Sequence, residues 1–180
     1  MASEATAPAP ARFWTETRRR VYGVVAIFAI GMSVYSALGE WRENHSFFIN
    51  ATESLPNWAF VLDNKHFPAR GQLILFKAPL TPLVVAHFGA SPATFTKIAY
   101  GVGGDRVTRV GRTFYVNGRQ VAVAKEKSLR GEVLALGPTG VIPRGCFFAA
   151  TPHKDGFDSR YAAIGWPCTD RVVGTGSAIL

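Results

Sequence analysis

Two polar side chains in a largely β-prone sequence could together perform nucleophilic catalysis. Ser54 lies in the polar segment 50–56, and Lys97 interrupts the otherwise apolar segment 94–100. A serine hydroxyl is a weak nucleophile until a base accepts its proton. A lysine that apolar neighbours partly desolvate has a lowered pKa, and its neutral amine can then act as that base. The residue types therefore indicate a Ser54/Lys97 dyad that attacks a carbonyl carbon.

Other kinds of site find less support in the sequence. A Ser-His-Asp triad can be drawn with His153 and either Asp155 or Asp158, but nothing favours it over the lysine dyad. Histidines, cysteines and carboxylates do not cluster at metal-ligand spacing, so we expect no metal and no cofactor. The glycine-rich run 101–104 lacks the Gly-Lys-Ser/Thr sequence and the following helix of a phosphate loop.

Composition predicts a folded domain. The 180-residue chain is 48% hydrophobic and contains 13 phenylalanines, which excludes a disordered protein. The net charge of +8 raises nucleic acid as a partner. The cations are scattered, however, apart from Arg12 and Arg18–Arg20, which lie directly before an apolar run. We interpret this cluster as a determinant of membrane topology and expect no nucleic-acid partner.

A membrane anchor is expected near the amino terminus. Residues 1–20 form a Pro-rich, basic tail that we expect to be disordered, and residues 21–38 carry no charge and are about long enough to cross a bilayer as a helix. A cleavable signal peptide is the competing interpretation, but the run is long for one and Ser36-Ala37-Leu38 is a weak cleavage pattern. We expect an uncleaved transmembrane anchor at 21–39, a stem at 40–49, and a cytoplasmic amino terminus.

The domain expected at 50–180 is mostly antiparallel β. Short β-branched or aromatic runs bounded by Pro, Gly or Asn predict strands at 58–62, 72–77, 94–102, 105–110 and 146–150. Residues 113–123 form two alternating strands around Asn117-Gly118, a pair typical of a type I′ hairpin turn. The segment 78–91 is expected to be an insertion or a mobile loop.

The chain contains two cysteines, Cys146 and Cys168. Their spacing matches no zinc-ligand pattern. A disulfide and two buried free thiols both remain open if the domain lies outside the cytoplasm.

The order of these motifs resembles the type I signal peptidases, membrane-anchored serine proteases with a Ser/Lys dyad. Within that superfamily the chain is most similar to the TraF type of conjugative-transfer peptidases, because it is short, has one anchor, and carries the run 140–145 ahead of 157–161. The motifs that carry the resemblance follow the anchor in the order Thr52-Glu53-Ser54-Leu55-Pro56, Arg70 to Phe76, Lys97 to Asp105, and Asp158-Ser159-Arg160-Tyr161.

The resemblance implies roles for individual residues. It makes Ser54 the nucleophile and Lys97 the general base, and it makes the Thr52 hydroxyl an oxyanion donor beside the backbone amide of Ser54. It also implies that Asp158 and Arg160 form an ion pair that supports the site. The turn after the base strand would be shaped by Gly101, Gly104 and Asp105.

Two positions depart from the family pattern. Gly156 replaces a serine whose hydroxyl commonly contacts the lysine, so we expect Ser159 or a water to orient Lys97 instead. Gly103 replaces a proline in the glycine-rich turn, at a cost in local rigidity.

The sequence and the resemblance together predict a membrane-bound serine endopeptidase in a bacterial inner membrane, with a periplasmic catalytic domain. Its substrate would be an exported precursor, a conjugative pilin precursor in the TraF type, with removal of a leader or terminal segment and pilin cyclisation as an open alternative. Two further alternatives remain, a general signal peptidase and a non-catalytic membrane-anchored assembly factor. The expected partners are the protein substrate and the lipid bilayer, and the oligomeric state is left open.

Overall fold

The structure is a computed structural model that describes residues 15–49, 59–92 and 94–179. The chain divides into two compact units, one ending at Glu43 and the other beginning at Asn44. Each unit is described by itself.

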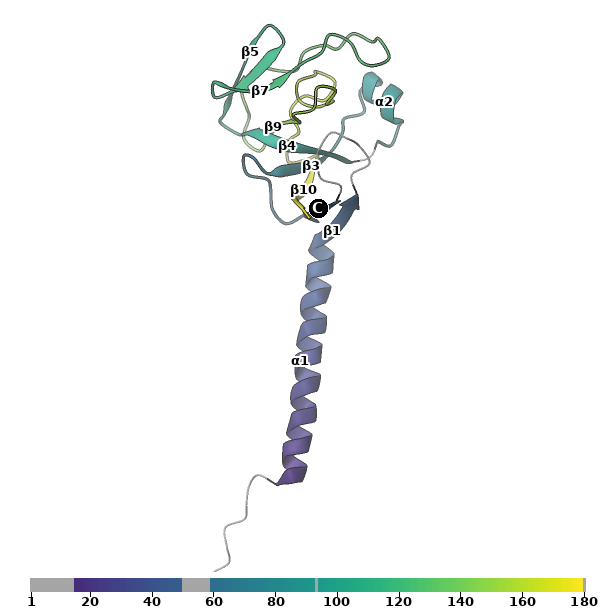
Figure 1. The fold of residues 1–180 in the computed structure, drawn as a ribbon, viewed down its shortest axis with the longest axis vertical. Helices are drawn as coiled ribbons and strands as arrows, with labels where there is room; N and C mark the ends of the chain where they lie inside the picture. Colours follow the sequence, from purple (N-terminus) through teal and green to yellow (C-terminus); the bar gives the residue numbers. More distant parts are fainter. Residues whose placement is uncertain (1–14, 50–58, 93, 180) are drawn as a thin grey trace, which may run out of the picture. The chain divides into compact units, whose positions relative to one another are not determined.

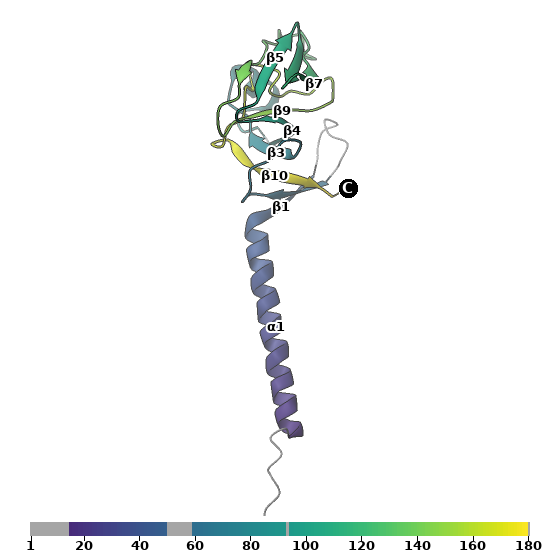
Figure 2. The ribbon, with the colours of Figure 1, turned by 90° about the vertical axis from the view of Figure 1, so that its left-hand side faces the viewer.

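The described part of the first unit is formed by the helix α1 (Glu16–Asn44), whose last residue belongs to the second unit and which is drawn as one continuous helix in Figure 2. None of its 29 residues is buried, and apolar side chains such as Ile27 and Phe28 are exposed. At 1.5 Å per residue, α1 is about 43 Å long. By length and composition α1 could cross a membrane. A helix that exposes apolar side chains on all sides is typical of a membrane span.

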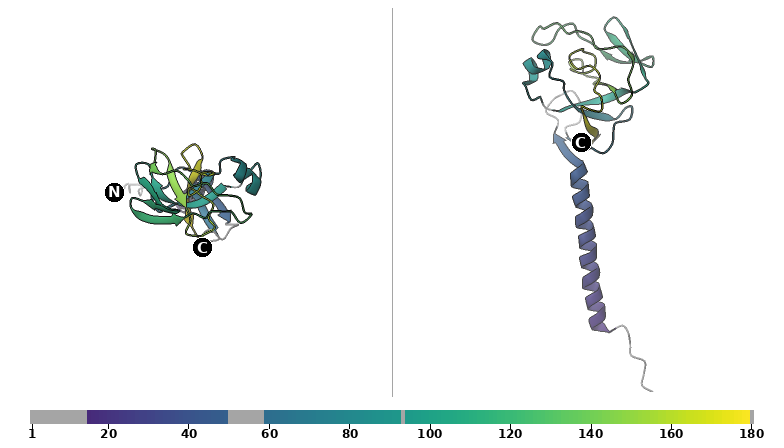
Figure 3. Two further views of the ribbon diagram at one scale, coloured as in Figure 1. Left: turned by 90° about the horizontal axis from the view of Figure 1, so that it is seen from above. Right: turned by 180° about the vertical axis from the view of Figure 1, so that it is seen from behind.

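The second unit is built on two antiparallel sheets, as Figure 1 shows and Figure 3 repeats from above and behind. The larger sheet has the order β1-β2-β10-β3-β4-β9, and the smaller has the order β7-β6-β5-β8. The strands are β1 (His45–Ile49), β2 (Ala59–Asp63), β3 (Leu73–Lys77), β4 (Thr94–Val102), β5 (Arg106–Val110), β6 (Thr113–Val116), β7 (Arg119–Val123), β8 (Gly140–Val141), β9 (Phe147–Ala150) and β10 (Val172–Ala178). This confirms the predicted mostly antiparallel β fold.

Several local predictions are confirmed. The strand expected at 94–102 is β4, with the same bounds. The hairpin expected at 113–123 is β6 and β7, and its turn residues Asn117 and Gly118 have φ angles of 49° and 79°. Positive φ at both central positions defines the type I′ turn.

Two strands were not foreseen. Residues 45–49, expected as part of a stem, form β1 and pair with β2. At the other end of the chain, β10 inserts between β2 and β3. Its glycines hide it from propensity rules, yet the packing needs them: a Cβ on Gly174 would lie 2.2 Å from the backbone oxygen of Asp63.

The expected loop at 78–91 contains the short helix α2 (Pro82–Phe88). Thr81 caps it by accepting a hydrogen bond from the backbone N–H of Val84, and Pro82 occupies the first turn, where its missing N–H costs nothing. Val84 is buried in the core. The prediction of a loop is therefore wrong for residues 82–88, which form a helix.

Strand β9 lies between the two hydrophobic clusters of the domain. All four of its residues are buried. Phe148 and Ala150 pack into one cluster, and Phe147 and Ala149 pack into the other. Because β9 pairs with β4, this double-sided packing fixes the strand that carries Lys97.

A disulfide joins Cys146, directly before β9, to Cys168, before β10. The N–H of the next residue, Phe147, donates to the carbonyl of Pro167 over 2.9 Å. The covalent link and the hydrogen bond together hold the segment before β10 against the start of β9.

Candidate active site

Lys97 lies on β4, where it pairs with Ile74 of β3. Its side chain is 7% exposed, and its Nζ lies 5.6 Å from the centroid of the Phe95 ring. Phe95 and Lys97 are two residues apart on one strand, so their side chains share a face of the sheet. Among the described residues, none forms a hydrogen bond with the Lys97 amine.

Burial lowers the pKa of Lys97 below its ordinary value of 10.5. The carboxylate of Asp158 opposes this shift and the guanidinium of Arg160 adds to it. Because the two neighbouring charges act in opposite directions, desolvation decides the direction of the change. More of the amine is therefore neutral near pH 7 than in an exposed lysine, as a general base requires.

Asp158 and Arg160 form the ion pair that the sequence predicted, and the protein buries both side chains almost completely. The contact is forked: Arg160 Nε donates to Asp158 Oδ1 over 2.8 Å, and Nη2 donates to Oδ2 over 2.9 Å. Burial raises the pKa of the Asp158 carboxyl, while Arg160 and Lys97 oppose that rise.

The ion pair also binds backbone from both sheets. Arg160 donates to the carbonyl oxygens of Val123, at the end of β7, over 3.0 Å and of Thr151, which follows β9, over 2.6 Å. The Asp158 carboxylate accepts from the backbone N–H of Thr151 over 3.1 Å. The pair therefore acts as a clamp between the two sheets, beside the strand that carries Lys97.

Ser159 was a candidate to orient the lysine. Its hydroxyl oxygen instead accepts a hydrogen bond from the backbone N–H of Ala149 over 3.0 Å, and its own N–H donates to the Ala149 carbonyl over 3.0 Å. Both bonds hold the loop after β9 against that strand. Ser159 is fully buried and has a structural role.

The turn after β4 brings two of the sequence motifs together. The Asp105 carboxylate accepts from the backbone N–H of Val102 and the side chain of Asn117, each over 2.8 Å, and from Arg70 Nε over 3.1 Å. Partial burial raises the pKa of Asp105, but these hydrogen bonds outweigh it and hold the pKa below its ordinary value. The partners Arg70 and Asn117 were missed because 35 and 12 residues separate them from Asp105.

Ser54 and Thr52, the predicted nucleophile and oxyanion donor, lie outside the described residues. The strands on either side of them are described, and Ile49 at the end of β1 pairs with Ala59 at the start of β2. The structure thus brings together Lys97, Asp158, Ser159 and Arg160 and leaves the other half of the predicted dyad undescribed.

The geometry around His153 does not favour the alternative Ser-His-Asp triad. His153 Nδ1 accepts from the backbone N–H of Asp155 over 3.2 Å. The Asp155 carboxylate binds Lys125, and that of Asp158 binds Arg160. Neither carboxylate is therefore placed to orient His153.

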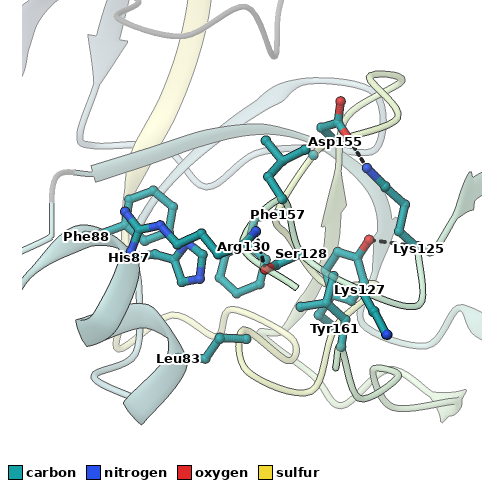
Figure 4. A pocket seen from close by; sticks show the side chains of 13 residues that line it. Leu83, His87, Phe88, Lys125, Lys127, Ser128, Arg130, Asp155, Phe157 and Tyr161 are labelled. Carbon is teal, nitrogen blue, oxygen red and sulfur yellow. Dashed lines mark hydrogen bonds and ion pairs between the residues drawn. The ribbon is translucent and has the colours of Figure 1, made fainter. Parts of the chain in front are cut away.

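A pocket of about 310 Å³ opens beside this region (Figure 4). Apolar and basic side chains both line it, and three of its residues, Gly156, Phe157 and Tyr161, belong to segments already singled out from the sequence. The residues that line it are Leu83, His87, Phe88, Lys125, Lys127, Ser128, Leu129, Arg130, Leu134, Asp155, Gly156, Phe157 and Tyr161.

A row of aromatic rings connects the pocket to the lysine. Tyr161 stacks on Phe157 at 5.6 Å between ring centroids, and Phe157 stacks on Phe88 at 5.9 Å. Phe88 meets Phe95 edge to face at 5.0 Å, and Phe95 contacts Lys97 Nζ. The pocket is thus linked to Lys97 through two rings, Phe88 at the pocket and Phe95 beside the amine.

Comparison with known proteins supplies a family. The family model described as "Signal peptidase, peptidase S26" matches residues 18–180, which includes every described part of the candidate site. No curated protein matches the chain.

We predict that Lys97 makes folding stability depend on pH. The unfolded chain, in which the pKa returns to about 10.5, binds more protons than the folded chain above the lowered pKa. The free energy of unfolding therefore rises as pH increases from the lowered pKa toward 10.5. This gain in stability is lost as pH falls back through the same range. The free energy of unfolding, measured with urea between pH 7 and 10.5, should rise with pH in the wild type and lack this rise in Lys97→Met. An equal dependence on pH in the two proteins would contradict the prediction.

We predict that removing either member of the clamp strongly destabilises the domain. Asp158→Asn or Arg160→Met leaves one buried charge without its partner, which typically costs about 3–5 kcal/mol. Urea unfolding monitored by tryptophan fluorescence measures the loss. Asp155→Asn is the matched control, because it breaks the more exposed Lys125–Asp155 pair in the same loop and should change stability far less. Similar losses for Asp155→Asn and Asp158→Asn would contradict the clamp.

Proposed function

The chain belongs to the signal peptidase family of peptidase S26, whose members are serine endopeptidases that cleave precursor proteins, and we propose that it does so with Ser54 as nucleophile and Lys97 as general base. The observation that carries the proposal is the buried Lys97 amine, whose pKa desolvation lowers. A buried lysine without a hydrogen-bonded carboxylate is costly as a structural group, but it suits proton abstraction.

The proposed reaction needs no group besides these two and water. Ser54 Oγ bonds to the scissile carbonyl carbon while its proton passes to Lys97 Nζ. When the tetrahedral intermediate collapses, the C–N bond breaks and Lys97 returns that proton to the leaving amine. Water then attacks the acyl-enzyme ester and gives a proton to Lys97, and Ser54 leaves with this proton.

The developing oxyanion needs fixed donors. We assign this role to the Thr52 hydroxyl and the Ser54 backbone N–H, on the strength of the family resemblance of the segment 52–56. The clamp of Asp158 and Arg160 contributes by holding the strands around Lys97 in place.

We propose that the protein acts at a membrane. Among the described residues, one helix near the amino terminus, α1, is long and apolar enough to serve as an anchor. Arg18–Arg20 lie in its first turns, and positive charges favour the cytoplasmic side. We therefore place the amino terminus in the cytoplasm and the β domain on the periplasmic face of a bacterial inner membrane.

The substrate we propose is the precursor of a conjugative pilin, as in the TraF type. The support comes from the sequence: the apolar anchor segment and the run 140–145 ahead of 157–161. If the substrate's own amino terminus attacks the acyl-enzyme in place of water, the product is a cyclic pilin. A general signal peptidase would use the same chemistry on many precursors.

The pocket is where we place an apolar segment of the substrate. Phe88 at its edge is 45% exposed although it belongs to the aromatic row that reaches Phe95. The basic residues Lys127 and Arg130 on the rim would favour an acidic neighbour in that segment.

We predict that Ser54→Ala and Lys97→Met each abolish processing. The test is mass spectrometry of a pilin precursor co-expressed with the full-length protein. Wild type should remove a defined terminal segment, and a product lighter by one further water would reveal cyclisation. Ser177→Ala and Lys77→Met, which alter exposed residues of β10 and β3, are the matched controls and should process normally.

Three results would change this proposal. Processing by Ser54→Ala or Lys97→Met would contradict the dyad. Processing of unrelated exported precursors at equal rates would favour a general signal peptidase. If every variant supports pilus assembly and no precursor is cleaved, the non-catalytic assembly factor is correct.

We predict that Phe88→Ser weakens substrate binding. It removes the exposed ring at the pocket edge, so KM should rise severalfold while kcat changes little. Steady-state cleavage of a precursor-derived peptide by the protein in detergent measures both. Phe67→Ser, which removes another exposed ring outside the pocket, is the control, and equal effects of the two would contradict the assignment.

A further inference from the structure

Thr151 directly follows β9, the strand that pairs with the strand carrying Lys97. Strands β4 and β9 pair Ala99 with Ala149 and Ile98 with Ala150. Continued by one residue, this register sets Thr151 opposite Lys97, with both side chains on the same face. Thr151 is fully buried.

The backbone of Thr151 is held by the clamp, but its hydroxyl is not. Its N–H donates to Asp158 Oδ2 and its carbonyl accepts from Arg160 Nη2. The buried Oγ1 has no hydrogen-bond partner among the described residues. Buried hydroxyls are rarely left unpaired, so this one calls for an explanation.

Gly156 supplies the second observation. A Cβ built on Gly156 would lie 2.3 Å from Thr151 Oγ1 and 3.0 Å from both Arg160 Nη2 and Asp158 Oδ2. The space that a side chain at position 156 would occupy is thus already filled by the Thr151 hydroxyl. The family resemblance implies a lysine-contacting serine at position 156, and the Thr151 hydroxyl lies where the side chain of such a serine would begin.

Two polar groups in this region therefore lack partners among the residues described: the Thr151 hydroxyl and the Lys97 amine. Ser159, the other candidate, already accepts from Ala149. The structure shows no hydrogen bond between Thr151 and Lys97, but the four-carbon lysine side chain can rotate to form one from the adjacent strand.

We propose that Thr151 is a positioning residue for Lys97. Its Oγ1 accepts a hydrogen bond from the neutral amine and so directs the nitrogen lone pair toward the nucleophile. This inference rests on the proposed role of Lys97 as the base. It also gives the clamp a second purpose, since Asp158 and Arg160 fix the backbone that carries the hydroxyl.

The test compares Thr151→Val with Thr151→Ser in the full-length protein. Valine keeps the shape and loses the hydroxyl, so kcat should fall about 10- to 100-fold with KM nearly unchanged, and the acid limb of the pH–kcat profile should move. Serine keeps the hydroxyl and should retain most of the activity. Valine fills nearly the same volume and leaves no buried hydroxyl to satisfy, so Thr151→Val should change the melting temperature little.

Thr175→Val is the matched control. The Thr175 hydroxyl donates to the Leu73 carbonyl over 2.9 Å, so this change should lower the melting temperature and leave kcat and its pH profile unchanged. A second variant moves the hydroxyl: Thr151→Ala combined with Gly156→Ser frees the space at position 156 and should recover activity that Thr151→Ala alone loses.

The pKa of Lys97 provides a readout independent of turnover. In a Ser54→Ala background, NMR titration of the labelled lysine should give a different pKa with and without Thr151→Val. Each of three results would overturn the inference: an unchanged pKa of Lys97, a wild-type kcat in Thr151→Val, or a parallel loss of stability and activity in Thr151→Val that Thr151→Ser does not rescue. If Lys97→Met abolishes cleavage while Thr151→Val does not affect it, the dyad stands and the positioning role falls; if Lys97→Met is active, both fall.

Discussion

The buried ion pair between Asp158 and Arg160 is the interaction on which the rest of the site depends. Two opposite charges in the protein interior are tolerable only when they are paired and their remaining hydrogen-bonding groups are satisfied. Here the remaining groups bind backbone atoms of Val123 and Thr151, so satisfying the charges also fixes the ends of two strands from different sheets. The residues around Lys97 are thereby held in one arrangement.

Because the two charges of this ion pair act on Lys97 in opposite directions, burial determines the direction in which its pKa shifts. A lone carboxylate next to the lysine would raise its pKa and keep it protonated. Because the guanidinium of Arg160 opposes the carboxylate of Asp158, desolvation prevails and the pKa falls. A clamp with little net charge can thus lie beside Lys97 while the pKa of the lysine stays lowered, as the proposed role of general base requires.

Lys97 lies between the hydrophobic core around β9 and the aromatic row that leads to the pocket. Strand β9 is buried on both faces and fixes β4 from one side. From the other direction a row of aromatic rings from Tyr161 to Phe95 leads from the pocket to the amine. If Lys97 is the base, as proposed, a substrate that binds along the rings approaches an amine on a strand held by the core, which favours the precise positioning that proton transfer needs.

The sequence alone determined the β fold, the hairpin at Asn117, the apolar helix and the motif that pairs Asp158 with Arg160, because each of these is encoded within a few neighbouring residues. It missed β10, whose glycines serve contacts with distant strands, and it assigned α2 to a loop. It proposed Ser159 as the substitute for the hydroxyl absent at Gly156. Only the tertiary structure showed that Ser159 binds β9 and that Thr151 fills the space beside Gly156, because that outcome depends on the register between two strands about fifty residues apart along the chain.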